Sequence, residues 1–330
     1  MQPGFFNNLY LEDDDSVLLP IKAERLFELQ VNYWSLASNG YQSLAAVQTK
    51  QFEFDNFEIE AHFNPGRIIS SSAKVDAKSI EARPCFLCTD NLPEEQKAVK
   101  IVNDYILLVN PFPIFLKHFT IPLVKHIPQA IYSEIENMLT ISSMLGKGYT
   151  VFYNGPRCGA SAPDHMHFQA GNFGFMKIDN GYKRIQNTYG KVIFEDAELA
   201  TTSITGCLRN FISVESNNFL KIAEEFKRIY DVLRIGSSGE EPMMNIICSY
   251  DNHWRLLIFP RSRHRPSYFF AEGDEKILIS PAAVDLGGVC IFPREEDFNK
   301  ITKELIVDIF DQVTLNNDEF NNILTRLKNK

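Results

Sequence analysis

Hydrophobic and polar positions alternate along several short stretches in the first half of the chain. Residues 51–63, QFEFDNFEIEAHF, place apolar side chains at every second position and slip once at Asp55-Asn56. Because successive side chains of a strand point to opposite faces, this pattern predicts a β-hairpin, and the NPGR that follows predicts a turn. Residues 106–109 and 118–122 predict two more strands joined by a proline-rich turn, and residues 149–155 predict another.

Apolar residues recur at helical spacing in other parts of the chain, which places them on one face of a helix. We expect helices over about residues 20–38, 128–145, 217–235, 294–313 and 317–328. This mixture of helices and hairpins predicts an α+β fold with antiparallel sheets flanked by helices.

The second half of the chain loosely repeats the first. Residues 245–266, NIICSYDNHWRLLIFPRSRHRP, follow the same order of apolar strand, turn, basic residues, proline and histidine as residues 106–128. This suggests an internal duplication after an N-terminal helical extension at residues 1–50, with halves at 51–185 and 186–330. The second half has no His-x-His pair, and its later strand is expected to be GGVCIFP, so we expect the chemistry in the first half.

Composition narrows the class of protein. The 330 residues are 45% hydrophobic, enough for a large core, and six cysteines are too few for a disulfide scaffold. A formal net charge of -9 argues against a nucleic-acid partner, because binding to the phosphate backbone needs a basic face. No run reaches the roughly 18 apolar residues of a membrane helix, and no signal peptide is recognisable. We therefore expect a cytoplasmic protein without a membrane partner.

The second half also contains a cluster of four arginines and two histidines near its predicted strand pair. Arg255, Arg261, Arg263 and Arg265 lie within eleven residues, facing either a shared cleft or solvent. His253 and His264 have no Cys or second His at ligand spacing, so we expect both to face solvent.

The stretch GASAPDHMHFQAG, residues 159–171, carries the strongest chemical signal. In a strand, His165, His167 and Gln169 would share one face, while the intervening Met166 and Phe168 would point to the core. The small residues before them are typical of a loop whose backbone approaches a ligand. Neutral imidazole is a good nucleophile toward phosphorus. The alternative is a surface strand whose histidines have no chemical role.

Cys85 and Cys88 form a C-x-x-C pair within RPCFLCTDNLP. By itself the pair is compatible with a redox centre, half of a zinc site or two buried small hydrophobic residues. Zinc needs four ligands, so a second pair would have to come from elsewhere in the chain.

The H-x-H-x-Q sequence after a Gly-Ser loop resembles the histidine-triad superfamily, in particular its transferase branch of galactose-1-phosphate uridylyltransferase, diadenosine tetraphosphate phosphorylase and GDP-hexose phosphorylase. KHFTIPLVKHIPQ, residues 117–129, is similar to a strand-turn-helix segment of that superfamily. DHMHFQA resembles strings in plant GDP-L-galactose phosphorylases, whereas the uridylyltransferases usually have proline in place of Asp164. Residues 280–298 resemble the closing segment of the GDP-hexose phosphorylases. The resemblance covers about residues 60–300 and implies two histidine-triad-like halves, the second degenerate.

The resemblance implies a covalent mechanism in which His167 attacks the α-phosphorus of a nucleotide and carries the nucleotidyl group. His165, through its backbone carbonyl, would fix the tautomer of His167. Gln169 stands where hydrolases of the superfamily have a third histidine; its neutral amide can bond a phosphoryl oxygen but cannot protonate a leaving group, which favours transfer or phosphorolysis. Ser161 would help to hold the phosphates.

The resemblance also indicates where the ligands bind. The residues expected to bind substrate are Asn64, Arg67, Lys74, Asn110, Phe112, Asn154, Arg157 and Gly159. Phe112, in the turn NPFP, would provide an apolar wall for a purine base or would simply pack in the turn. The resemblance to the uridylyltransferases implies a structural zinc ion held by Cys85, Cys88, His118 and His165, whereas the resemblance to the GDP-hexose and tetraphosphate phosphorylases implies none. No organic cofactor is expected.

We predict phosphorolysis of a nucleoside diphosphate sugar such as a GDP-hexose, with inorganic phosphate or a sugar phosphate as the acceptor. The alternatives are a dinucleoside tetraphosphate phosphorylase, a hexose-1-phosphate uridylyltransferase and a nucleotide-binding protein without turnover. A thiol redox protein built on the cysteine pair is a further alternative. The uridylyltransferase relatives suggest a homodimer.

Overall fold

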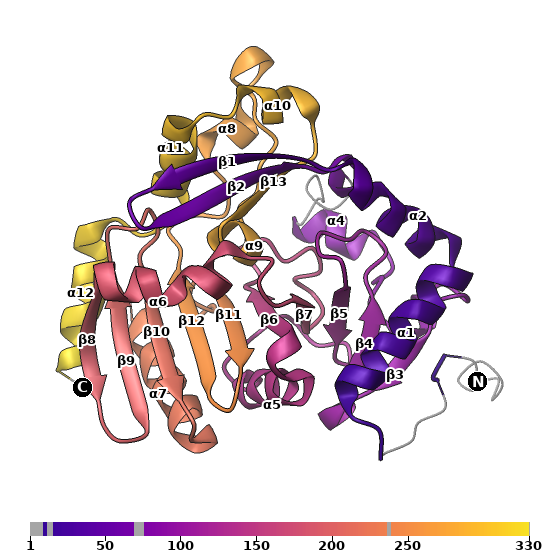
Figure 1. Cartoon of the computed structure of the whole chain (residues 1–330), viewed down its shortest axis with the longest axis horizontal. Helices are drawn as coiled ribbons and strands as arrows, with labels where there is room; N and C mark the ends of the chain where they lie inside the picture. The colour runs from indigo at the N-terminus through magenta and orange to yellow at the C-terminus, as the bar shows by residue number, and fades with distance from the viewer. Residues whose placement is uncertain (1–8, 12–15, 69–75, 236–238, 330) are drawn as a thin grey trace.

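The computed structural model describes residues 9–11, 16–68, 76–235 and 239–329 of the chain (Figure 1). Within these ranges, ten strands form one antiparallel sheet, and helices cover it. In sheet order the strands are β3 (Ala98–Lys100), β4 (Ile106–Val109), β5 (His118–Pro122), β7 (His167–Asn172), β6 (Tyr149–Asn154), β11 (Met244–Tyr250), β12 (Trp254–Pro260), β10 (Phe211–Ser216), β9 (Leu199–Ile204) and β8 (Gly190–Glu195). The predicted α+β class with antiparallel sheets flanked by helices is confirmed.

The large sheet consists of two halves with the same topology. The order β3-β4-β5-β7-β6 in the first half matches β8-β9-β10-β12-β11 in the second, and β6 pairs with β11 where the halves meet. The predicted register of the duplication was wrong, since β11 and β12 occupy the places of β6 and β7 rather than those of β4 and β5. Short apolar strands look alike in sequence, and only their pairing distinguishes them. The tight turn at residues 251–253 replaces the long connection at 155–166, so the second half lacks the loop that precedes β7.

Each of the five predicted helical segments contains helix, with shifted ends, whereas the helix at residues 177–189 and three short ones were not predicted. The α-helices are α1 (Leu19–Tyr33), α2 (Ser35–Ser43), α4 (Ala77–Glu81), α5 (Ile135–Leu145), α6 (Lys177–Tyr189), α7 (Phe219–Leu233), α8 (Ser267–Phe270), α9 (Ala283–Leu286), α10 (Glu295–Lys300), α11 (Lys303–Val313) and α12 (Asn317–Lys328). The first predicted helix is interrupted at Trp34, whose backbone is extended, and the helix expected from residue 128 begins at Ile135. Among the described residues, no helix is both long and apolar enough to cross a membrane.

A second, three-stranded sheet combines a hairpin from the early part of the chain with a strand from its late part. The hairpin of β1 (Gln48–Phe54) and β2 (Phe57–Phe63) turns at Asn56, whose φ of 62° suits a tight hairpin turn. The strand β13 (Val289–Phe292) runs parallel to β2. The segment expected to be a later strand of the second half therefore completes a sheet with the first hairpin instead. In Figure 1 this small sheet lies across one end of the strands of the large sheet.

The core has two apolar layers, one on each face of the large sheet. On β6, Val151 belongs to the layer that includes residues of α1, α5 and α7, whereas Phe152 belongs to the layer under the small sheet. Met166 and Phe168 are fully buried in the first layer, as the alternating pattern predicted. Their neighbours His167 and Gln169 consequently face the other side of the sheet, where a cavity opens.

Candidate active site

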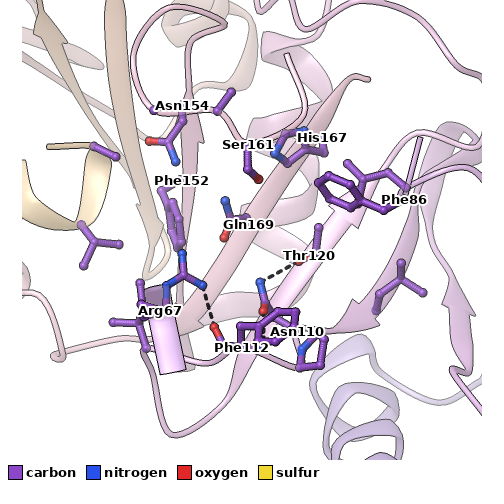
Figure 2. A pocket seen from close by; sticks show the side chains of 18 of the residues that line it. Arg67, Phe86, Asn110, Phe112, Thr120, Phe152, Asn154, Ser161, His167 and Gln169 are labelled. Carbon is purple, nitrogen blue, oxygen red and sulfur yellow. Dashed lines mark hydrogen bonds between the residues drawn. The ribbon is translucent and has the colours of Figure 1, made fainter. Parts of the chain in front are cut away.

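A cavity of about 680 Å³ lies on the face of β4, β5, β7 and β6, and it is closed on one side by residues of the second half. The predicted site residues among its lining are His167, Gln169, Ser161, Arg67, Asn110, Phe112, Asn154 and Gly159 (Figure 2). The structure thus brings together side chains from five separate segments of the first half. Ser161 lies beside His167, with its hydroxyl directed into the same space (Figure 2).

His167 is the first residue of β7 and is 3% exposed. Its Nδ1 lies 2.8 Å from the carbonyl oxygen of His165, so the Nδ1–H donates to that carbonyl. Burial lowers the pKa of His167 to about 4, which keeps the ring neutral. The Nε2 atom therefore keeps its lone pair, which is the form that a nucleophile requires. The carbonyl contact is the one that the resemblance implied.

Gln129, a residue for which no role was predicted, positions the backbone of His167. The β6–β7 pairing stops at Phe152 and Gln169, and beyond that point the amide of Gln129 bridges the two strands. Its Oε1 accepts from the N–H of His167 at 2.8 Å, and its Nε2 donates to the carbonyls of His167 at 3.0 Å and Asn154 at 3.1 Å. The only sequence signal was its place at the end of KHIPQ, in the segment that carried the resemblance.

Gln169 is oriented by a buried histidine. The Nδ1 of His118 accepts from the N–H of Ile114 at 3.3 Å, and its Nε2 lies 2.9 Å from Oε1 of Gln169. Burial and the nearby charge of Arg67 lower the pKa of His118 to about 3, so the neutral ring donates its Nε2–H to Gln169. The amide nitrogen of Gln169 is then left to face the cavity, on the side of Ser161 (Figure 2).

Asn154 presents a second amide to the cavity. Its Oδ1 accepts from the N–H of Ala283 at 2.9 Å and from Nδ2 of Asn245 at 2.8 Å, so its own Nδ2 is turned toward the cavity (Figure 2). Gly159 has a φ of +97°, and a Cβ there would lie only 2.7 Å from Cβ of Ala282. Glycine thus lets the loop before β7 pack closely against the second half.

Arg67 is a buried, positively charged side chain in the lining of the cavity. Its Nη1 donates to the carbonyl of Phe112 at 2.6 Å, and no carboxylate forms an ion pair with it among the described residues. Burial lowers the pKa of Arg67 to about 10, which still leaves it charged at neutral pH. The carboxyl group of Asp285 acts on Arg67 without forming an ion pair with it, and because a buried charge that is not directly paired is costly, this guanidinium is suited to bind an anionic group of a ligand.

Arg83, a side chain given no firm role from the sequence, lines the cavity beside the loop before β7. Its Nη2 donates to Oδ1 of Asp164 at 3.1 Å and to the carbonyl of Ser161 at 3.4 Å, and its guanidinium lies over the ring of Phe86. Asp164, which takes the place of a proline in the uridylyltransferases, therefore anchors an arginine at the edge of the cavity.

Two predicted substrate-binding residues, Asn64 and Arg157, are not brought to the cavity, and a third lies outside the described residues. Asn64 is buried, and its Nδ2 donates to the carbonyl of Pro113 at 3.1 Å, so it supports the turn that Phe112 belongs to. Arg157 pairs with Glu240 at 2.7 Å, outside the lining. Lys74 lies outside the described residues.

The second half contributes one wall of the cavity. Its lining residues are His264, Arg265, Ser280, Ala282, Val284, Asp285 and Ile291. The expectation that His264 faces solvent was wrong, since its Nε2 lies 3.3 Å from the hydroxyl of Ser280 within this wall. Of the clustered arginines, Arg265 reaches the cavity, whereas Arg261 is buried with carbonyl and amide partners and Arg255 pairs with Glu215.

A cluster of thiols and imidazoles lies behind the loop that carries Ser161. The ligand atoms of Cys85, Cys88, His126 and His165 all lie within 4.8 Å of one another. Cys85 Sγ is 3.2 Å from Nδ1 of His165, and Cys88 Sγ is 3.2 Å from Nδ1 of His126. A tetrahedral zinc ion, with bonds of about 2.0 to 2.3 Å, would separate its ligand atoms by roughly 3.3 to 3.8 Å. The four residues thus fit a metal ion.

The predicted fourth ligand was wrong, because His118 lies at the opposite end of β5 from the cluster. His118 pairs with Gly171, whereas the end of β5 lies beside His167. The chain after β5 approaches the cluster, where the carbonyl of Leu123 accepts from Nε2 of His165 at 2.6 Å and His126 follows. This contact leaves Nδ1 of His165 as the ligand atom, an arrangement typical of metal-binding histidines. His165 itself precedes β7 and does not line the cavity.

The comparisons with known proteins agree with this architecture. A domain of unknown function (DUF4922) matches residues 26–172, and the GDPGP1-like C-terminal domain matches residues 191–330. The chain is similar to the crystal structure of yeast Ap4A phosphorylase Apa2, with 15% identity, a TM-score of 0.54 and coverage of 85% of this chain and 94% of that chain. For Apa2 in complex with AMP, the values are 14%, 0.55, 87% and 98%. A search of the curated proteins finds no match.

The fold is similar to that of yeast Ap4A phosphorylase Apa2, and residues 191–330 match the GDPGP1-like C-terminal domain. Both findings are consistent with the resemblance to the transferase branch of the histidine-triad superfamily. The expectation of an enzyme of the nucleotidyl-transferring, phosphorylase type agrees with both matches.

Proposed function

We propose that this chain is a nucleotidyl-transferring phosphorylase that acts through a nucleotidyl-His167 intermediate. The observation that carries the proposal is the neutral imidazole of His167, whose Nδ1–H is held by the carbonyl of His165 while Nε2 is left to react. The cavity beside it is lined by three arginines and one aspartate, so it favours an anionic ligand although the chain as a whole is acidic.

In the first step, the Nε2 lone pair attacks the α-phosphorus and forms an N–P bond, while the bond from that phosphorus to the bridging oxygen breaks. The leaving group departs with the electron pair as a sugar phosphate. The amide hydrogens of Gln169 and Asn154 and the hydroxyl of Ser161 would donate to the oxygens around the phosphorus as their charge grows. Donors held in advance in this way typically contribute about 3 kcal/mol each.

In the second step, an oxygen of inorganic phosphate attacks the same phosphorus, and the N–P bond breaks. The products are a nucleoside diphosphate and the regenerated imidazole. Gln169 cannot supply a proton, and a phosphate leaving group does not need one, because the second pKa of a phosphate monoester is about 6. An amide at this position is therefore suited to exchange between phosphates.

The proposed substrate is a nucleoside diphosphate sugar such as a GDP-hexose. The Phe and Trp side chains of the lining, which include Trp34, Phe86 and Phe112, come from the N-terminal extension and the first half. The described lining residues of the second half include no Phe, Trp or Tyr but do include the hydrogen-bonding groups of Ser280, His264 and Arg265. The aromatic side of the cavity is suited to hold a single nucleobase, and the polar wall is suited to hydrogen-bond the hydroxyl groups of a single sugar. The similarity to an Ap4A phosphorylase supports a dinucleoside tetraphosphate as the second candidate.

We further propose that the Cys85, Cys88, His126 and His165 cluster binds a structural zinc ion. Two thiolates and two imidazoles are a common ligand set for zinc. A bound ion would cross-link the segments around the loop before β7 and hold His165, whose carbonyl positions His167. In this arrangement His165 acts as a ligand and a positioning residue and does not take part in proton transfer.

Mass spectrometry after incubation with nucleotide sugars tests the intermediate. We expect a nucleotidyl mass increment on the peptide that contains His167, which disappears on addition of phosphate. His167→Ala should abolish the adduct and lower turnover by at least about a thousandfold. His253→Ala removes an exposed histidine from the turn before β12 and should leave both the adduct and the turnover unchanged. Normal turnover by the His167→Ala variant would refute the proposal.

A further inference from the structure

The strand that carries the proposed nucleophile lies between two different sides of the cavity. In sheet order, β7 lies between β5 and β6. Beyond β5 is β4, whose Leu108 lines the cavity together with the aromatic side chains of Trp34 and Phe86. Beyond β6 is β11, the first strand of the second half to follow in the sheet. In Figure 2, Phe86 and Asn154 accordingly lie on opposite sides of Gln169. A nucleotide whose base lies on the aromatic side therefore has its reaction partner on the side of the second half.

The wall of the second half contacts the loop before β7. A Cβ on Gly159 would lie only 2.7 Å from the Cβ of Ala282, so the two backbones pass close to each other. Ser280 precedes Ala282 by two residues, and two residues of extended chain span at most about 7 Å. Ser161, two residues after Gly159, lies beside His167 (Figure 2). The part of the wall around Ser280 is thus close to the reacting end of the cavity.

Arg265 is the positively charged side chain of this wall among its described lining residues. Its Nε donates to Oγ of Ser280 at 3.1 Å, and its guanidinium carbon lies 3.9 Å from the centre of the Phe269 ring. These contacts orient the guanidinium through Nε and through one of its faces. The Nη–H groups of an arginine held in this way form a fork of donors that suits the oxygens of a phosphate.

Two other ionisable groups line the same wall. Burial, together with the charges of Arg265 and Arg261, lowers the pKa of His264 to about 3, so this ring is neutral and adds no charge of its own. The carboxyl group of Asp285 accepts from two backbone N–H groups at 2.9 and 3.0 Å. It also acts on the guanidinium groups of Arg67 and Arg261. The fixed positive charge on this side of the reacting end therefore comes from Arg265.

We infer that Arg265 binds the inorganic phosphate that accepts the nucleotidyl group. The second half, which has no nucleophile, would then determine that phosphate and not water is the acceptor. An anionic acceptor is concentrated and oriented by the guanidinium, whereas water gains nothing from this charge. The same group would bind the terminal phosphate of the departing sugar phosphate in the first step. The inference rests on the proposed function in that a nucleotidyl group is attached to His167.

Decay of the isolated adduct tests the inference. Protein carrying the nucleotidyl group is freed of nucleotide sugar, and the loss of the adduct is followed at increasing concentrations of inorganic phosphate and in phosphate-free buffer. In Arg265→Gln, the phosphate concentration for half-maximal decay should rise at least about tenfold, while the slow decay in water stays unchanged. Arg263→Gln removes an exposed arginine two residues away that does not line the cavity, and it should behave as wild type.

A wild-type response of Arg265→Gln to phosphate would overturn the inference and leave the proposed adduct standing. An equal loss of decay in phosphate and in water would also overturn it, because that result assigns Arg265 a general structural role. Arg265→Met, which keeps an apolar chain against Phe269, has the same expected result and serves if Arg265→Gln does not fold.

A binding measurement separates this inference from the proposed function. Inorganic phosphate is titrated calorimetrically into protein saturated with GMP, whose own phosphate occupies the position next to His167. Binding at least about tenfold weaker in Arg265→Gln than in wild type would support the phosphate site even in a protein that forms no adduct, a result that refutes the proposed function alone. Equal phosphate binding by the two proteins would overturn the inference.

Discussion

Replacement of Gln129 by leucine should separate the role of this residue from that of the catalytic side chains. The substitution keeps a similar volume but removes the amide that bridges β6 and β7. Three buried backbone groups lose their partners: the N–H and carbonyl of His167 and the carbonyl of Asn154. Each unpaired buried group costs about 1 to 3 kcal/mol, so the loss of stability should be at least about 3 kcal/mol.

The same change should also affect the proposed chemistry, because Gln129 holds the backbone at the nucleophile. A displacement of His167 by about 1 Å is enough to lower kcat about a hundredfold. Denaturant unfolding gives the free energy, and turnover is measured under conditions where the variant is folded. Gln42→Leu is the exposed control and should change stability by less than about 0.5 kcal/mol. If Gln129→Leu were within about 1 kcal/mol of wild type, the bridging role inferred for its amide would be wrong.

Two further predictions concern the metal cluster and a buried carboxyl group. His126→Ala should lose bound zinc as measured by elemental analysis, whereas His118→Ala should keep it and lose activity through Gln169; zinc retention in the first variant would exclude His126 as a ligand. Burial raises the pKa of Glu241 from 4.5 to about 7, so the folded state keeps a proton that the unfolded chain has released between these values. The contribution of Glu241 to the free energy of unfolding is present in full below about pH 4.5. As the pH rises to about 7 this contribution is lost, and the free energy of unfolding falls by up to about 3 kcal/mol. Unfolding measured across this range should show a shallower decline in Glu241→Gln, while Glu240→Gln, an exposed neighbour, should keep the wild-type slope; an unchanged slope in the first variant would contradict this assignment.

Local structure follows closely from the sequence. The alternation over residues 51–63 predicted the hairpin, and the spacing of apolar residues predicted five helical segments although not α6, because burial of one face is what both patterns reflect. The H-x-H-x-Q stretch identified His167, Gln169 and Ser161, and all three line one cavity. Only the assignment of His165 to the strand failed, since β7 begins two residues later.

The pairing of segments far apart in the chain was decided only by the tertiary structure. His118 and His126 both lie near β5, and the sequence gives no measure of which end of that strand meets the cysteine pair; an extended strand carries its two ends too far apart for both to do so. The register of the duplication and the pairing of β13 with β2 depend likewise on long-range contacts.

The sequence by itself determined which residues have the right chemistry: the nucleophilic histidine, the amide after it, the thiol pair and the small residues of the loop. The tertiary structure decided which residues serve them. Gln129 and His126 have no distinctive local pattern, because the role of each depends on a partner in another segment that folding brings within hydrogen-bonding or metal-binding distance.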